Sequence, residues 1–148
     1  MLMESTNNGY AYIVSRDYGF APNPFYNVLT LATCKPVIRK NAKVGDFIIG
    51  NAQKENNYKL IYIAKISKIL TFDEYWNSPE YACKKPVMNG SLMKLYGDNI
   101  YHHSDTDSKK WIQEDSHHSL EDGSPNPKNL ERDTSRTDHV LICTEYYY

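Results

Sequence analysis

The pattern of apolar and polar positions predicts a chain built mainly from β-strands. Residues 10–15 are β-branched and aromatic, which predicts a first strand. Residues 58–70 alternate most regularly and carry apolar side chains on both faces, as expected of a long central strand. Shorter apolar runs predict strands at 47–51 and 138–143, whereas 28–33 fits either a strand or the first turn of a helix.

Two short helices are predicted between these strands. Pro36 suits the first turn of a helix that ends near Asn41. The sequence Thr71-Phe-Asp-Glu74 is a T-x-x-E capping box, which predicts a helix from there to about Asn77, before Pro79. The predicted fold class is therefore α+β: a small curled, mostly antiparallel sheet or barrel, PUA/ASCH-like by analogy, with short helices and a long polar loop.

Two long segments lack regular periodicity. Residues 16–27 contain two prolines, a glycine and four aromatic residues, so this loop either folds back onto the core or forms a pocket wall. Residues 84–136 are polar and punctuated by Gly and Pro, which is typical of a loop-rich functional or disordered segment. The length predicts a single domain over 1–148, with residues 1–8 expected to be flexible.

Composition excludes several classes of protein. A chain of 148 residues that is 41% hydrophobic and 24% charged can bury a core and is not a disordered chain. No apolar run approaches the ~20 residues of a membrane helix, and no signal peptide is recognised, so we expect no membrane association and a cytoplasmic location. Three widely spaced cysteines, Cys34, Cys83 and Cys143, predict reduced thiols in place of a disulfide framework or a zinc cluster.

The formal net charge of -1 conceals an uneven distribution. Residues 1–70 carry nine Lys/Arg and four Asp/Glu, a net of +5, and residues 71–148 carry eight and fourteen, a net of -6. The basic half suits contact with phosphate, and a balance of charge within the molecule is an equally good explanation. Four cations lie within residues 35–43, where a solvated helix face is the commoner arrangement.

Two adjacent histidine pairs, His102-His103 and His117-His118, are candidates for chemistry. Neighbours in an extended chain point in opposite directions, so each pair offers at most one imidazole to a common site. The HxH and HExxH spacings are absent, and we predict no metal site and no cofactor. Ser116-His-His-Ser119 places hydroxyls beside imidazoles, but nucleophile and base usually come from distant segments.

Cys34 is the third candidate, because Lys35 and Arg39 lie close to it in sequence. Nearby cations would lower the pKa of its thiol, although a buried structural cysteine is the expected role. The sequence contains neither a Walker A loop nor a GxGxxG fingerprint. It therefore does not by itself indicate an enzyme.

Aromatic rings, amides and cations form the remaining candidate set. Stacking of a base on such rings is worth ~1–3 kcal/mol, and amides can read the edge of a base. Seven stretches also resemble a known family: RDYGFAPNPF (16–25), LATCKP (31–36), VGD (44–46), LTFDEYW (70–76), KPVMNGS (85–91), GDNIY (97–101) and SHHS (116–119). Over about Tyr10 to Tyr146 the chain resembles the nucleotide modification associated domain, type 2.

The resemblance implies a protein associated with bacterial or bacteriophage systems that modify DNA bases or nucleotides. It transfers no catalytic residue, and it leaves His117 and His118 as the candidate acid/base pair of an enzyme. It makes the motif positions candidates for ligand binding. These are Arg16, Asp17, Tyr18, Phe20, Asn23, Lys35, Arg39, Tyr75, Trp76, Asn89, Asp98, Asn99, Ser116, His117, His118 and Ser119.

Four functions follow as hypotheses. The first is a module that binds a modified base or nucleotide, free or within DNA, in an aromatic and amide-lined pocket. The second is a base- or nucleotide-modifying transferase or hydrolase, and the third is a protein that sequesters a nucleotide signal in antiphage defence. The fourth is an interaction protein without a pocket, and exposed aromatic residues leave a homodimer open.

Overall fold

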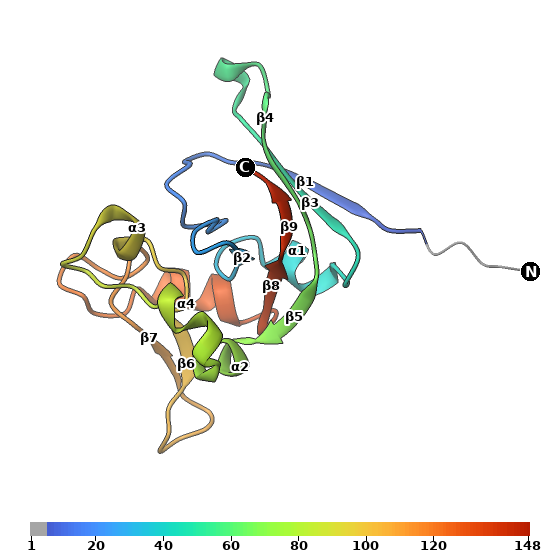
Figure 1. Ribbon diagram of the computed structural model, residues 1–148. Helices are drawn as coiled ribbons and strands as arrows, with labels where there is room; N and C mark the ends of the chain where they lie inside the picture. Colours follow the sequence, from blue (N-terminus) through green and yellow to red (C-terminus); the bar gives the residue numbers. More distant parts are fainter. Residues whose placement is uncertain (1–5) are drawn as a thin grey trace, which may run out of the picture.

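The computed structural model describes residues 6–148 and shows an α+β fold (Figure 1). The larger sheet has the order β1-β3-β4-β9, in which β1 is parallel to β3 and the other pairs are antiparallel. A second, antiparallel sheet has the order β2-β8-β5, and β6 and β7 form a separate hairpin. The strands are β1 (Gly9–Ile13), β2 (Leu29–Leu31), β3 (Phe47–Asn51), β4 (Leu60–Lys65), β5 (Lys68–Thr71), β6 (Tyr101–His103), β7 (Trp111–Gln113), β8 (His139–Cys143) and β9 (Glu145–Tyr147).

The two main sheets are joined where the chain passes twice between them. β4 runs into β5 at Ser67, and β8 runs into β9 at Thr144 (Figure 1). These two residues contact each other, because the Ser67 hydroxyl accepts a hydrogen bond of 2.9 Å from the Thr144 N–H. The prediction of one strand over 58–70 is therefore wrong, since the chain changes sheets at Ser67. Within residues 6–148 the sheets stay open, so the barrel alternative is not formed.

The hydrophobic core lies on both faces of the smaller sheet. β8 supplies Leu141 and Cys143 to one cluster, which packs against the larger sheet, and Val140 and Ile142 to the other. All four side chains are buried, as the period of two along a strand requires when both faces are covered. The second cluster also contains Phe72 from the helix that covers this face.

The four α-helices are short. They are α1 (Pro36–Asn41), α2 (Phe72–Asn77), α3 (Leu92–Leu95) and α4 (Pro127–Thr134), with 3-10 turns at Lys54–Asn56 and Pro79–Lys84. The capping box of α2 is confirmed, because Thr71 Oγ1 accepts from the Glu74 N–H and Glu74 Oε1 accepts from the Thr71 N–H. The helix predicted to begin at Pro36 is confirmed as α1.

The segment 84–136 is loop-rich, and it also contains α3, the β6–β7 hairpin and α4. The start of α4 is fixed by Asn126, whose side-chain oxygen accepts from the N–H groups of Lys128 and Asn129, and by Pro127 in the first turn. α4 is the element of this segment that contributes to the site described below.

Residues 1–8 were expected to be flexible, and most of this prediction concerns residues 1–5, which lie outside the described residues. Asn8 is held in place, because its N–H donates to the Asp46 carboxylate at 2.9 Å. No helix within residues 6–148 combines the length and apolar character that a membrane crossing needs.

Candidate functional site

A cavity of about 520 Å³ lies where four segments distant in sequence meet. Its walls come from β1 and the loop that follows it, from the chain entering α1, from the turn at 117–118, and from α4. The aromatic loop at 16–27, for which folding on the core and forming a pocket wall were both open, does both. Phe20 is buried in the core and also lines the cavity.

One wall of the cavity is aromatic. The ring of His117 meets Tyr18 and Phe20 edge-on, with centroid distances of 5.5 and 5.2 Å. Tyr18 is itself stacked on Tyr96 at 5.6 Å, and Phe20 is stacked on His118 at 4.6 Å. These contacts hold the rings in fixed orientations, while Tyr18 stays 45% exposed. The wall therefore offers a preformed surface to a flat ligand.

Cationic side chains line the same cavity as the rings. Arg16, Lys35 and Arg132 line the cavity, and the Lys35 ammonium lies 4.8 Å from the centre of the Tyr12 ring. Among the described residues, the lining includes no carboxylate. The arrangement favours an anionic ligand that also carries an apolar or aromatic part.

Cys34 also lines the cavity, on a strained stretch of backbone. Its φ is 59° and that of Lys35 is 42°, both in the left-handed region that non-glycine residues seldom occupy. The backbone is clamped on both sides: the Cys34 N–H donates to Asp133 Oδ1 at 2.8 Å, and Arg39 Nε donates to the Cys34 carbonyl at 2.7 Å. The strain is thus maintained by two buried charged side chains.

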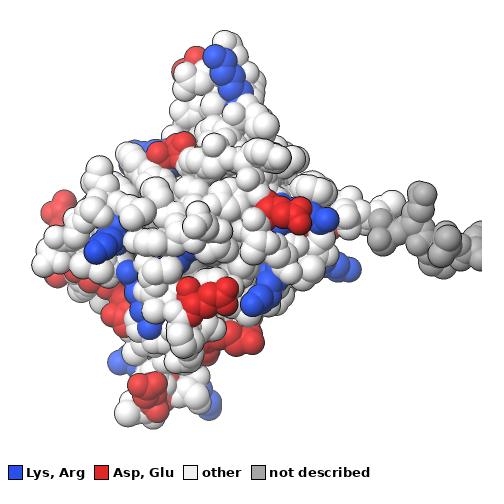
Figure 2. All heavy atoms as spheres, in the orientation of Figure 1, with Lys and Arg blue, Asp and Glu red and all other residues white. Residues whose placement is uncertain are grey.

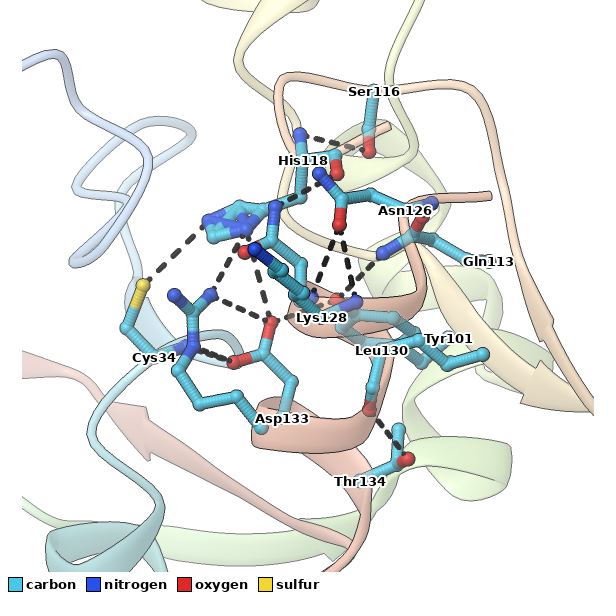
Figure 3. A network of polar contacts seen from close by, with 12 residues as sticks. Cys34, Tyr101, Gln113, Ser116, His118, Asn126, Lys128, Leu130, Asp133 and Thr134 are labelled. Carbon is cyan, nitrogen blue, oxygen red and sulfur yellow. Dashed lines mark hydrogen bonds and ion pairs between the residues drawn. The ribbon is translucent and has the colours of Figure 1, made fainter. Parts of the chain in front are cut away.

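A chain of polar contacts runs from the Cys34 sulfur into the protein (Figure 3). Cys34 Sγ lies 3.5 Å from His118 Nε2, and His118 Nδ1 accepts from Arg132 Nη2 at 3.0 Å. Arg132 Nε in turn donates to Asp133 Oδ1 at 2.9 Å. Because a guanidinium can only donate, the imidazole proton is on Nε2 and is directed at the sulfur.

The protonation states follow from burial. Desolvation lowers the pKa of His118 to about 4 despite the nearby Asp133 carboxylate, so the ring is neutral at pH 7. Burial also lowers the pKa of His117, and the charge of Arg16 adds to that effect. Burial raises the pKa of the Cys34 thiol, and Asp133 raises it further, while Arg132 and Arg39 act in the opposite direction. The lowered pKa considered for Cys34 as the alternative to a structural role does not occur, because desolvation outweighs the neighbouring cations.

Six of the residues predicted from the sequence are brought together by the fold. They are Arg16, Tyr18, Phe20, Lys35, His117 and His118, and all of them line the cavity. Ser116 and Ser119 shape the turn that presents the two histidines, since the Ser119 hydroxyl accepts from the Ser116 N–H at 3.0 Å and donates to its carbonyl at 2.7 Å. Both serines line a second hollow of about 430 Å³, which shares His117 with the cavity.

Four other predicted residues lie in a separate buried network. They are Asn23, Tyr75, Asp98 and Asn99, each no more than 1% exposed. Their partner is Lys84, whose ammonium donates to the side chain and the carbonyl of Asn23 and to Thr30 Oγ1. Asp98 accepts from the hydroxyls of Thr30 and Tyr75, at 2.6 Å in both cases. This network stabilises the fold and does not line the cavity.

The remaining candidates lie elsewhere. Arg39 is fully buried, and its Nε donates a hydrogen bond to the Cys34 carbonyl. Asp17 is exposed and accepts a hydrogen bond from the Tyr148 hydroxyl, and Asn89 is exposed in a loop. Trp76 is stacked on His102 at 4.1 Å, outside the cavity. Within residues 6–148, no group of three His, Cys, Asp or Glu side chains is arranged to hold a metal ion.

Sequence reasoning missed Arg132 and Asp133 as members of the site and treated Cys34 as structural. The local sequence of α4 gives no sign that these two charged residues face a cysteine about a hundred positions earlier. For Cys34 one signal existed, since it lies in the LATCKP stretch that carries the family resemblance. Of Cys34, Arg132 and Asp133, only Asp133 is fully buried.

The fold and the site define an α+β protein with a cavity that is lined by aromatic rings and by cations. The family model for nucleotide modification associated domain 2 matches residues 6–148, and the chain belongs to this family. No curated protein and no solved structure shows significant similarity to the chain.

Proposed function

We propose that this protein binds a nucleotide in the cavity that is lined by aromatic rings and cations. The observation that carries the proposal is the presence in one cavity of the Tyr18, Phe20 and His117 rings and of three cations, with no carboxylate among the described lining residues. A base would stack on the rings, and the phosphate would pair with Arg16, Lys35 or Arg132. Membership of a family associated with nucleotide modification supports the same class of ligand.

The dimensions of the cavity agree with this class of ligand. About 520 Å³ lies within the ~300–1,000 Å³ of small-molecule sites, which is room for one nucleotide and not for a folded polymer. Stacking on aromatic side chains contributes ~1–3 kcal/mol per base. Arginine binds phosphate through paired N–H donors and adds geometric selectivity for the anion. The amides expected to read the edge of the base are outside the cavity, so the neutral His117 and the cations take that role.

A free nucleotide, or a single base turned out of a strand, suits the surface better than a duplex does. The face seen in Figure 2 mixes acidic and basic side chains and has no continuous basic area. A groove that tracks a DNA backbone normally shows such an area. A base within duplex DNA would have to be flipped into the cavity, at a cost of a few kcal/mol.

Binding can be tested by a thermal-shift screen of nucleoside mono-, di- and triphosphates with canonical and modified bases, followed by calorimetry on the best ligand. A ligand at 100 times its dissociation constant adds ~2.7 kcal/mol to the unfolding free energy, which raises the melting temperature by several degrees. Tyr18→Ala and Lys35→Gln should each weaken binding about tenfold, or ~1.4 kcal/mol.

Two exposed residues outside the cavity provide matched controls. Tyr58→Ala removes a ring of similar exposure, and Lys40→Gln removes an exposed cation of the neighbouring helix α1. Both variants should bind like the unmodified protein. If all four variants have the same affinity, or if no nucleotide shifts the melting temperature, the cavity is not a nucleotide site.

A further inference from the structure

We propose that Cys34 is the nucleophile of this cavity and adds reversibly to C6 of the base of a bound pyrimidine nucleotide. The inference rests on the nucleotide binding proposed above and adds to it a substrate class and a reaction. It starts from the sulfur, which lines the cavity and lies 3.5 Å from His118 Nε2.

The surroundings of Cys34 differ from those of a packing cysteine. Arg132 fixes the proton of His118 on Nε2, so that the imidazole donates to the sulfur and stabilises negative charge there. Cys143, in contrast, is fully buried among apolar side chains of the core. A hydrogen-bond donor directed at a cavity-lining sulfur serves a nucleophile, whereas a cysteine used for packing does not need one.

The backbone supports the same role. Cys34 and Lys35 both have positive φ, and the carboxylate of Asp133 and the guanidinium of Arg39 hold the two backbone polar groups of Cys34. Consecutive left-handed non-glycine residues also occur at Tyr26–Asn27 and Asn57–Tyr58, so positive φ alone does not mark a functional residue. Cys34 is distinguished by the two buried charged side chains that hold its backbone at the cavity.

The chemistry of a stacked pyrimidine matches a thiol. C6 is the electrophilic carbon of the ring, because C5=C6 is conjugated with the C4 carbonyl of uracil or the C4 amidine of cytosine. The Cys34 thiol loses its proton to water, and the His118 Nε2–H stabilises the resulting thiolate. As Sγ forms a bond to C6, the π electron pair moves to C5 and onto O4 of uracil, or onto N3 of cytosine. Water then protonates C5, which completes a saturated adduct. Reversal removes a proton from C5 and breaks the C6–S bond, so no oxidant, reductant or other reactant is consumed.

The cations of the cavity would lower the energy of the intermediate. Negative charge develops on O4 of uracil, or on N3 and O2 of cytosine, as the sulfur adds, and Arg16 and Lys35 line the same cavity. Preorganised cations act on developing charge most strongly where water is partly excluded. Purine nucleotides lack an equivalent C5=C6 acceptor and should bind without reacting.

The experiment follows the C5 hydrogen of dUMP and dCMP by proton NMR in D₂O, with binding of the same nucleotides measured in parallel by calorimetry. Each cycle of addition and reversal replaces the C5 hydrogen by deuterium, so the C5–H signal should decay with the unmodified protein. Cys34→Ser should bind both nucleotides and reduce exchange to the rate of the buffer blank. Cys83→Ser, which removes an exposed thiol outside the cavity, should exchange at the original rate.

A second pair of variants tests His118 as a positioning residue. His118→Gln keeps an N–H donor in reach of the sulfur and should retain part of the exchange rate, whereas His118→Leu should lose exchange even at saturating nucleotide. Pyrimidine binding without exchange, or exchange that survives in Cys34→Ser, would overturn the proposed chemistry and leave nucleotide binding intact. Absence of dUMP and dCMP binding in the calorimeter would overturn the pyrimidine chemistry, and nucleotide binding itself would be overturned only if no nucleotide of the wider screen bound.

Discussion

Asp133 connects the cavity to the interior of the protein. Its carboxylate accepts from the Cys34 N–H at 2.8 Å, from the Tyr101 hydroxyl at 2.7 Å and from the Arg132 guanidinium at 2.9 Å. A fully buried carboxylate is stable in the fold only when such donors surround it. Because Arg132 is held here, it can also donate to His118 and keep that ring neutral.

The neutral, buried His118 predicts a specific pH dependence of stability. Its pKa is about 4 in the folded protein and near 6.5 when unfolded, so the unfolded chain binds more protons between these values. The stability that it contributes is complete above pH 6.5 and is lost as the pH falls towards 4. Between pH 7 and 4 this loss is on the order of 3 kcal/mol.

Urea unfolding of the unmodified protein and of His118→Gln at a series of pH values measures the effect. Other groups titrate in both proteins, so the difference between the two curves isolates His118. The unmodified protein should lose more stability on acidification than the variant does. Parallel curves would show that His118 is not held as a buried neutral ring.

At the scale of elements, Lys84 connects the 3-10 turn Pro79–Lys84 to β2 and to the loop before it. Its ammonium is 0% exposed and donates to Asn23, to the Val28 carbonyl and to Thr30. Burial lowers the pKa of Lys84 to about 8 and raises that of the neighbouring Asp98 to about 6. Such a network holds its elements in one arrangement, because each member left unpaired would carry a large desolvation cost.

Removing this cation should therefore destabilise the protein strongly. Lys84→Met leaves Asp98 and four oxygen acceptors without their charged partner, and we expect a loss of ~3–5 kcal/mol in the free energy of unfolding. Lys85→Met is the matched control, because the Lys85 ammonium lies 3.8 Å from the centre of the Trp76 ring near the surface and its loss should cost about 1 kcal/mol or less. Chemical denaturation of both variants checks the contrast, and equal losses would contradict the role of Lys84.

The elements that were predictable are those whose signals are local. The capping box at Thr71 and the proline at position 36 act through their own neighbours, and both helices form as expected. The break at Ser67 was not predictable, because it depends on pairing with β8 and on contact with Thr144, 77 residues away. The burial of Lys84 depends in the same way on the packing of the whole domain.

The same contrast between local signals and contacts between distant residues applies to the candidate site. Tyr18, Lys35 and His118 were found because their residue types and motifs suit a planar anion. Cys34 and His118 are 84 residues apart in sequence, and no spacing rule relates them. The amides of Asn23 and Asn99 could hydrogen-bond the edge of a base. In the fold, Asn23 instead accepts from the buried Lys84 ammonium, and Asn99 donates to a buried backbone carbonyl.

At the scale of the whole molecule, folding mixes the basic and acidic halves of the chain. The net charges of +5 over residues 1–70 and -6 over 71–148 do not produce a single basic area on the face in Figure 2. The cavity brings together cations from both halves, since Arg16 and Lys35 come from the first half and Arg132 from the second. This arrangement supports the proposal that the cavity binds one compact anion with an aromatic group.

The most direct test of this account locates the ligand. Amide chemical shifts of the ¹⁵N-labelled protein, recorded during a titration with dUMP and dCMP, should change first at residues 16–20, 34–38 and 117–118, and at Arg132. The same titration of Lys35→Gln should show these changes at higher ligand concentration. Shifts confined to other parts of the chain, or none at saturating nucleotide, would contradict nucleotide binding in this cavity.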